Sequence, residues 1–483
     1  MINFNAIFQI VGILLMIVGV FMFTPIIFSY YFHSGDELPI FISAVITMIV
    51  GFSFFWATRK KDHTVQKREG YLIVSVGWAF MLIASSLPFL VSGAIPSVTD
   101  AFFETVSGMT TTGASILNDI EGMPKGILFW RSMTQWIGGM GIIVLTIAIL
   151  PILGIGGIEL FVAEAPGPTS DKIHPRIRQT ASALWIIYVS LTAILCGLLY
   201  FGGMSFYDAI NHALTTMATG GFSTKNASVA FFTSPYIHYV LIVFMFLAGV
   251  NYTIIFFLVR FDLKRVWNNE EFRGYLVIVV FFAILASLMV QHATNGPWEK
   301  SFRDATFQVV SLITTTGFVT ADYTAWKTSL TALFFILLFA GASAGSTAGG
   351  IKLIRHVVFV KNSFLEFKRL LHPRAVIRVK MNKEIVPARI LTHILVFLLI
   401  YLGVFVIGSI VVSGLGMDFL SAMGAVATSL GNVGPGIGTV GPLDNFAPLS
   451  DAVKWVLMFL MLLGRLELFT ILILFTPYFW KAN

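Results

Sequence analysis

The chain has 483 residues, of which 57% are hydrophobic and 11% charged, and its formal net charge is +7. Soluble domains are roughly 45–50% apolar and about 25% charged, so this composition excludes a soluble globular protein and indicates an integral membrane protein. Apolar runs of about 20 residues, long enough to cross a bilayer, recur from end to end and leave no room for a separate cytosolic catalytic domain. The single cysteine, Cys196, excludes an intrachain disulfide and a cysteine-based metal site.

The first two apolar runs, at about 7–28 and 38–57, predict two N-terminal transmembrane helices within residues 1–58. The first run lacks a basic n-region and a small-residue cleavage site, and a second long run follows it. We therefore expect a retained helix and not a signal peptide.

Lysine and arginine cluster in loops between the apolar runs, at 59–68, 172–178, 260–273 and 352–389. This distribution is typical of membrane topology and not of a nucleic-acid-binding face, so no nucleic-acid partner is expected. The positive-inside rule places these loops in the cytoplasm. The loops at 33–39 and 439–451 are poor in lysine and arginine and are expected outside.

Four segments share one layout, in which an aspartate, an apolar stretch and Ser/Thr residues precede a glycine thirteen positions after the aspartate. They are DAFFETVSGMTTTG (100–113), DAINHALTTMATGG (208–221), DATFQVVSLITTTG (304–317) and DFLSAMGAVATSLG (418–431). Long apolar runs flank each segment. Because a half-helix and a polar string are too short to span the membrane, each segment is expected to re-enter it.

These repeats predict an all-α polytopic membrane protein: two N-terminal helices plus four repeats of helix, pore half-helix, filter loop and helix around one pseudo-fourfold pore. The pore repeats are expected at 71–155, 180–262, 274–360 and 388–478, with a basic cytoplasmic loop at 361–387. Ten spans result, and an even number places both termini in the cytoplasm.

Irregular backbone at membrane depth is tolerated only where it is buried in protein or lines a water-filled cavity, so four polar strings predict one central pathway. The aspartates suit N-cap or first-turn positions of the half-helices. The half-helix C-termini then point at the strings and favour a cation. The expected caps are Asp100, Asp208, Asp304 and Asp418. The alternative is ordinary Ser/Thr/Gly helix packing, which four copies in register make improbable.

Rings of backbone carbonyls from four loops replace the hydration shell of K⁺ in tetrameric channels, and this chain supplies four such loops by itself. The fourth string, TSLGNVGPGIG, departs most from the others, which leaves open which of its carbonyls meet the ion. The predicted selectivity filter comprises Thr110, Thr111, Thr112, Gly113, Thr219, Gly220, Gly221, Thr315, Thr316, Gly317, Ser429, Leu430, Gly431, Asn432 and Val433.

At these residues the sequence resembles the Trk/Ktr/HKT superfamily of potassium transporters, most of all the bacterial Trk-type transmembrane subunits, and the resemblance covers nearly the whole chain. It implies uptake of K⁺, and also of Rb⁺, across the bacterial inner membrane, with K⁺ bound in the filter. It also implies a homodimer with one pore in each subunit and a cytoplasmic nucleotide-binding partner of the TrkA type that gates the pore. Glycine at the first filter position, Gly113, resembles the K⁺-selective members.

The stretch GASAGSTAGGIK (341–352) lies inside the apolar run at 330–354. It is not a Walker A motif, because that motif needs Gly-Lys-Ser/Thr after its second glycine and a soluble strand before it. Each glycine costs a helix about 1 kcal/mol relative to alanine, so we expect an unwound segment that obstructs the cavity below the filter. In the resembled family this stretch is similar to an intramembrane gating loop; close helix packing is the alternative. The gate candidates are Gly341, Gly345, Ser346, Thr347, Gly349, Gly350, Lys352, Arg465 and Asn251.

Two of these gate candidates are polar side chains inside apolar runs. Arg465 lies within 453–475, where an unpaired arginine costs roughly 2.5–3.5 kcal/mol on insertion scales. It is expected to face the pore as an electrostatic barrier, or to pair with a carbonyl of the broken helix; the two interpretations are compatible. Asn251 is expected either to hydrogen-bond the small-residue segment or to make an interhelical packing bond.

The basic stretch at 352–389 is expected to meet anionic lipid headgroups or to dock the cytosolic partner. The leading hypothesis is a K⁺-conducting pore, and the alternative is an H⁺- or Na⁺-coupled K⁺ symporter, which would need a protonatable or Na⁺ site within the membrane. No nucleophile–base cluster, metal-ligand spacing or phosphate loop occurs in the sequence, so neither an enzyme nor an organic cofactor is expected.

Overall fold

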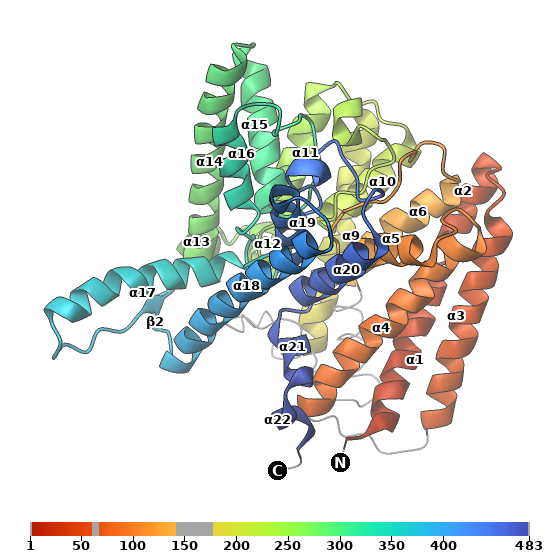
Figure 1. The fold of residues 1–483 in the computed structure, drawn as a ribbon, viewed down its shortest axis with the longest axis horizontal. Helices are drawn as coiled ribbons and strands as arrows, with labels where there is room; N and C mark the ends of the chain where they lie inside the picture. The colour runs from red at the N-terminus through yellow and green to blue at the C-terminus, as the bar shows by residue number, and fades with distance from the viewer. Residues whose placement is uncertain (1, 60–66, 142–176, 482–483) are drawn as a thin grey trace.

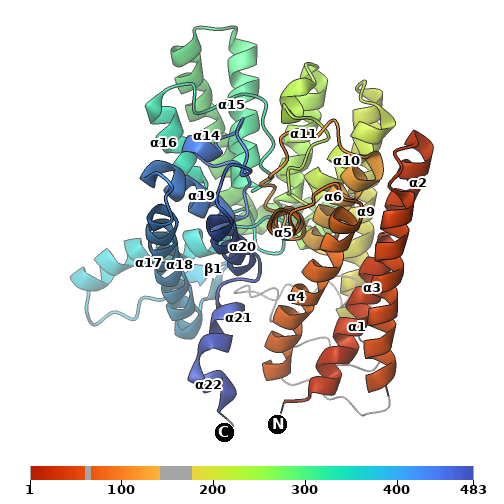
Figure 2. The same ribbon diagram turned by 45° about the vertical axis from the view of Figure 1, so that its right-hand side comes forward.

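The computed structural model describes residues 2–59, 67–141 and 177–481. Its described part is helical apart from one short antiparallel ribbon, formed by β1 (Lys380–Met381) and β2 (Glu384–Ile385). The all-α class predicted from the repeats is therefore confirmed. Helices α1, α3 and α4 lie at one side of the molecule, and α17 extends as an arm at the opposite side (Figure 1 and Figure 2).

The N-terminal helices are α1 (Phe4–Phe21), α2 (Thr24–Phe32) and α3 (Glu37–Thr58). Helices α1 and α2 together form one apolar span, which is longer at both ends than the predicted run at 7–28. A Cβ atom added to Gly12 would lie 2.6 Å from the carbonyl oxygen of Gly51, and one added to Gly51 would lie 2.8 Å from that of Gly12. The backbones of α1 and α3 therefore touch, as small residues permit in membrane helix pairs.

Each repeat begins with a long apolar helix, followed by a short pore helix, a polar string and a second helix. The long helices are α4 (Lys67–Val91), α9 (Ile177–Phe201), α14 (Glu270–Thr294) and α18 (Ala388–Gly414). The pore helices are α5 (Val98–Met109), α10 (Phe206–Met217), α15 (Trp298–Ile313) and α19 (Phe419–Gly431). The second helices are α6 (Lys125–Trp136), α11 (Pro235–Ala248), α16 (Thr328–Leu337) and α20 (Asp451–Arg465).

The remaining elements are shorter or lie beyond the second helices. They are the π-helical turn η1 (Ile137–Gly141), η3 (Ser228–Phe231), α12 (Tyr252–Val259), α13 (Leu263–Asn268), α17 (Leu353–Leu371), η4 (Gly438–Val440), α21 (Phe469–Leu472), η5 (Ile473–Phe475) and α22 (Pro477–Trp480).

The second helices do not run straight through the membrane. The chain has no helix between Leu337 and Leu353, as the glycine-rich stretch predicts. The apolar runs at 236–259 and 453–475, expected to be continuous spans, are also broken: α11 and α12 are bent by 111°, and α20 and the helix after it by 107°. The break after α11 is stabilised because the freed N–H of Tyr252 donates to the carbonyl oxygen of Gly345 at 3.1 Å.

Six of the described helices are long and apolar enough to cross a membrane, and eight spans result if each bent pair counts as one. The protein is thus a multi-pass membrane protein. The ten predicted spans would also need α6, which with η1 extends to Gly141, where the described residues stop, and α16, which has only 10 residues. Both ends of the chain lie at the same end of the molecule (Figure 1), where Nη2 of Arg68 donates to the carbonyl oxygen of Tyr478 at 3.2 Å.

Candidate ion-conduction site

The first two pore helices begin with the same serine cap. The hydroxyl of Ser97 accepts from the N–H of Asp100 at 3.3 Å, and that of Ser205 accepts from the N–H of Asp208 at 3.1 Å. Both aspartates are therefore first-turn residues, where a negative charge suits the helix dipole, and the caps themselves are serines.

The other two predicted caps differ from each other. Asp418 is the N-cap of α19, and its carboxylate accepts from the N–H of Ser421 at 3.0 Å. Asp304 is not a cap and does not lie in the first turn, because α15 begins at Trp298, one turn earlier than the equivalent helices. This corrects the expectation for the third repeat.

All four pore helices end in the same hydrogen-bonded turn. In each, a residue in the left-handed region donates to the carbonyl three positions earlier, and the next N–H donates to the carbonyl five positions earlier, which is a Schellman motif. The left-handed residues are Thr111, Thr219, Thr315 and Asn432, with φ of 57°, 54°, 53° and 52°. This conformation is a strained outlier for a β-branched residue, and such outliers cluster at functional sites.

Two positions later, each string has a glycine in the left-handed region. These glycines are Gly113, Gly221, Gly317 and Gly434, here called the glycine ring. The fourth member is Gly434 and not the predicted Gly431, which is the last residue of α19, and Ser429 and Leu430 also lie inside that helix. The error arose from counting from the aspartate: from the N-caps Ser97 and Asp418, the ring glycine is sixteen residues away in both repeats.

The ring glycines make a closed set of close contacts. An added Cβ on each would meet the carbonyl oxygen of the residue just before the next repeat's ring glycine. The distances from the added Cβ to the carbonyl oxygen are 2.1 Å for Gly113 and Gly220, 2.0 Å for Gly221 and Thr316, 2.1 Å for Gly317 and Val433, and 2.7 Å for Gly434 and Thr112. The four repeats therefore follow in order around one centre, and any side chain at these glycines would displace a neighbouring carbonyl.

One cavity is lined by all four ring glycines, with Arg131, Lys225 and Asp444 among its other residues. The carbonyl oxygens of Thr112, Gly220, Thr316 and Val433 occupy equivalent positions against the ring glycines. Backbone carbonyls in such a ring can replace the hydration shell of a monovalent cation.

The chain between α16 and α17, residues 338–352, is here called the intramembrane segment, and it lies against the C-terminal ends of the pore helices, where the polar strings begin. The N–H of Gly349 donates to the hydroxyl of Thr315 at 2.7 Å. The hydroxyl of Thr347 donates to the carbonyl oxygens of Met217 and Ala248, at 3.0 and 3.2 Å. The segment is thus attached to the polar string of its own repeat and to the C-terminal ends of α10 and α11 in the second repeat.

Arg465 joins the intramembrane segment to the first and last repeats. Its Nη1 donates to the hydroxyl of Thr111 at 3.1 Å and to the carbonyl oxygen of Thr347 at 2.9 Å. Its Nη2 donates to the carbonyl oxygens of Gly138 and Gly139 in η1. The guanidinium therefore lies beneath the strings among protein carbonyls.

The structure also places the other gate candidates. The side chain of Asn251 caps α12 by accepting from the N–H of Thr253 at 2.8 Å, so the hydrogen bond to the intramembrane segment comes from the neighbouring backbone and not from this amide. Nζ of Lys352 donates to the carbonyl of Ala348. Within the segment, Gly341 donates to Ile351 and Ser346 to Ser343, while Gly345 and Gly350 adopt positive φ.

Three carboxylates near the strings were missed from the sequence, of which Glu104 and Glu271 are buried and Glu467 is partly buried. Oε1 of Glu271 accepts from the N–H of Ala344 at 2.7 Å, and Glu467 forms an ion pair with Arg355. Glu104 pairs with Arg131 at 2.5 Å. The available signal was the rarity of acids inside apolar runs, which marks function in membrane proteins.

A fourfold ring of backbone carbonyls in a multi-pass helical chain, with an irregular segment hydrogen-bonded to it, defines a membrane transport protein. The family model TrkH, described as a cation transport protein, matches residues 37–481. The chain belongs to this family, which also confirms the resemblance seen in the sequence, and it is not an enzyme.

Relatives match over almost their full length. The chain is 41% identical to the Trk system potassium uptake protein TrkH of Salmonella typhimurium, over 99% of this chain and 100% of that protein. It is 34% identical to the Trk system potassium uptake protein TrkG of Escherichia coli strain K12, over 98% and 97%. The crystal structure of the potassium transporter TrkH from Vibrio parahaemolyticus aligns with a TM-score of 0.89 and 39% identity, covering 99% and 100%.

Proposed function

We propose that this protein takes up K⁺ across the bacterial inner membrane through a K⁺-selective, channel-like pore. The observation that supports this proposal is the closed glycine ring, in which each ring glycine lies against a backbone carbonyl of the next repeat. The names of the relatives, potassium uptake proteins, support K⁺ as the cargo. Inward movement of one cation gains about 2.3 kcal/mol for each 100 mV of membrane potential, so no coupled ion is needed.

The intramembrane segment is the proposed gate, and Arg465 its electrostatic barrier. A positive charge hydrogen-bonded both to Thr111 and to Thr347 lowers cation occupancy directly below the filter. Opening requires these bonds and the bond between Gly349 and Thr315 to be broken together. The filter residues proposed to bind K⁺ are those of the four strings, with Gly434 in place of Ser429, Leu430 and Gly431, which lie within α19.

The proposed control comes from a cytoplasmic nucleotide-binding subunit of the TrkA type. Helix α17 follows the intramembrane segment directly, and the N–H of Leu353 donates to the carbonyl of Ala342 at 3.0 Å, so a force on α17 reaches the gate. Lys368, in the last turn of α17, and Arg374 and Arg378, after the end of that helix, are exposed and suit an acidic partner surface. We also propose that both termini are cytoplasmic and that the protein is a homodimer with one pore in each subunit. The basic loop is proposed to contact lipid headgroups as well as the partner.

The test is rubidium uptake into liposomes under an imposed potential, with and without competing sodium. It compares wild type, Gly113→Ser and a matched control, Gly414→Ser, whose added Cβ meets nothing within 4 Å. Because the gate is expected to be shut without its regulator, the series is repeated in an Arg465→Gln background. We expect uptake that is driven by the potential and is not inhibited by sodium. Only Gly113→Ser is expected to become sensitive to sodium. A strict requirement for a proton or sodium gradient would contradict the pore in favour of symport.

A further inference from the structure

The pore helices of the first three repeats carry a polar side chain at one equivalent position, four residues after the aspartate: Glu104, His212 and Gln308. Each contacts the chain that leaves the filter, here called the exit strand, residues 114–117, 222–225 and 318–321. Glu104 accepts from the hydroxyl of Ser115 at 3.0 Å and from the N–H of Ile116 at 2.9 Å. The corresponding contacts are His212 with Ser223 at 2.9 Å and Gln308 with Thr320 at 3.4 Å.

The fourth repeat lacks such a side chain. Its equivalent residue, counted from the N-cap, is Ala425, and the exit strand packs directly on the helix, since a Cβ on Gly424 would lie 2.7 Å from the backbone nitrogen of Ile437. Three of the four exit strands are thus held by a side chain two or three residues beyond the ring glycine, and only the first by a carboxylate.

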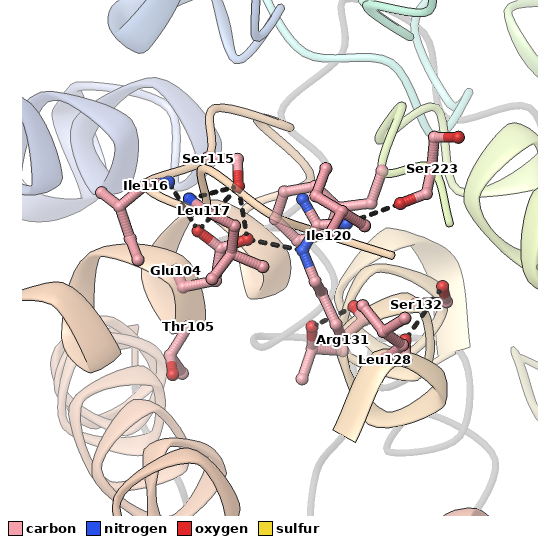
Figure 3. A network of polar contacts seen from close by, with 12 residues as sticks. Glu104, Thr105, Ser115, Ile116, Leu117, Ile120, Leu128, Arg131, Ser132 and Ser223 are labelled. Atoms are coloured by element: carbon pink, nitrogen blue, oxygen red, sulfur yellow. Dashed lines mark hydrogen bonds and ion pairs between the residues drawn. The ribbon is translucent and has the colours of Figure 1, made fainter. Parts of the chain in front are cut away.

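The carboxylate of Glu104 has a cationic partner, Arg131 of α6, that also contacts the second repeat. Glu104 and Arg131 are only 1% and 2% exposed, and Nε of Arg131 lies 2.5 Å from Oε1 of Glu104. Nη1 of Arg131 donates to the carbonyl oxygen of Ser223 at 3.0 Å, and the guanidinium lies 3.5 Å from the ring centroid of Phe222. Figure 3 shows this continuous network from Ser115 through Glu104 and Arg131 to Ser223.

The Glu104–Arg131 pair also lies close to the proposed path of the ions. Arg131 lines the cavity that contains all four ring glycines, so its charge lies beside the cation path. A charge in a partly desolvated site acts much more strongly than in water, and Glu104 cancels it. The planar, five-donor guanidinium suits this combination of carboxylate, carbonyl and aromatic contacts, which a lysine cannot reproduce.

We propose that Glu104 and Arg131 are positioning and charge-balancing residues for ion selectivity. The pair fixes the first and second strings relative to each other, two residues beyond Gly113 and Gly221, and keeps the outer mouth of the filter from repelling cations. This inference rests on the proposed function, in which the four strings form the filter.

The test measures two quantities separately in the liposome assay, in the Arg465→Gln background: the KM for rubidium and the inhibition by sodium. Glu104→Gln keeps the shape but leaves the arginine charge unbalanced, so KM is expected to rise about tenfold and sodium discrimination to fall. In Glu104→Gln with Arg131→Gln the charge is balanced again, and KM is expected to return to within about threefold while discrimination stays low. Arg131→Lys keeps the charge and is expected to lose discrimination with little change in KM.

Each variant's thermal midpoint and amount of folded protein are measured as well, because breaking a buried pair destabilises a fold. The control is Asp262→Asn, which breaks a solvent-exposed ion pair with Arg265 far along the chain from the strings. Lower stability with unchanged KM and sodium inhibition would overturn the inference and leave a structural pair only. A wild-type protein without K⁺ preference would overturn the proposed function instead. If Glu104→Gln does not fold, Arg131→Lys alone decides the selectivity question.

Discussion

The hydroxyl of Thr315 accepts a hydrogen bond from the backbone N–H of Gly349 at 2.7 Å. This bond joins the filter string of the third repeat to the intramembrane segment without an intervening residue. Thr315 is also one of the four left-handed residues that end the pore helices, and its ring glycine, Gly317, is two positions away. A movement of the intramembrane segment therefore pulls on Thr315, which is only two residues from the ring glycine.

Replacing Thr315 by valine is expected to raise the rubidium flux measured without the regulator. Valine keeps the shape but removes the acceptor, and an unpaired buried N–H costs about 1–3 kcal/mol, so the closed state should lose about tenfold in population. Thr315→Ser keeps the hydroxyl and should remain closed. Thr331→Val, which removes a hydroxyl bonded only to its own helix, is the control. Equal flux in the valine variants at both positions would rule out this role.

Arg465→Gln is expected to open the pore further. The shorter, neutral amide cannot reach the hydroxyl of Thr111, the carbonyl of Thr347 and the carbonyls of η1 together, so both the barrier and the attachment are lost. A rise in basal rubidium flux of at least about tenfold should follow, since hydrogen bonds to charged groups contribute about 1.5–3 kcal/mol each. Arg465→Lys keeps the charge and should give an intermediate flux. A Gln variant no faster than wild type would contradict the barrier.

Two glycines of the fourth repeat are expected to respond differently to substitution by serine. Gly434 has a φ of 102°, and its added Cβ would lie 2.7 Å from the carbonyl of Thr112. Gly434→Ser should therefore abolish discrimination against sodium, as Gly113→Ser should. The added Cβ of Gly431 would instead lie 3.0 Å from the carbonyl of Leu338, away from the ring, so Gly431→Ser should retain discrimination. If sodium competition instead shows that Gly431→Ser loses discrimination and Gly434→Ser retains it, the predicted assignment of Gly431 to the filter would be restored.

Gly12→Ala is expected to destabilise the N-terminal helix pair. The new methyl group would lie 2.6 Å from the backbone carbonyl of Gly51, which cannot move aside, and overpacking costs about 1–3 kcal/mol. Gly77→Ala is the matched variant, because its methyl would meet only the flexible end of Leu14 at 3.1 Å, and alanine improves helix propensity by about 1 kcal/mol. Thermal unfolding in detergent should show a lower midpoint for Gly12→Ala alone.

Much of the architecture could be predicted because membrane helices are specified locally. Long apolar runs gave the spans, and spacing from Asp100 and its counterparts gave three of the four ring glycines. The glycine-rich stretch at 341–352 gave the irregular segment. These features depend on composition and periodicity within one stretch of chain, which a sequence displays directly.

The remaining features depend on contacts between distant stretches. The bends at 249–251 and 466–468 interrupt runs that are apolar enough to be read as continuous spans, and they are stabilised by partners in other repeats, such as Gly345 for Tyr252. The ion pair of Glu104 joins residues 27 positions apart on two helices, and no periodicity selects Arg131 among the available cations. The register of the fourth string was misjudged because Asp418 is the N-cap of its pore helix, whereas Asp100 is the third residue of the first pore helix, so counting from the aspartates compares different positions.

The ring of glycine contacts closes between the two ends of the chain, and this has a consequence for biosynthesis. Nδ2 of Asn432 donates to the hydroxyl of Thr112, across 320 residues. At a synthesis rate of about 5–20 residues per second, the first string waits about 16 to 64 seconds for its last neighbour. During that interval the strings already made lack their last neighbour, so their polar backbone has an incomplete set of partners. A truncation before Asn432 is therefore expected to leave an unfinished ring.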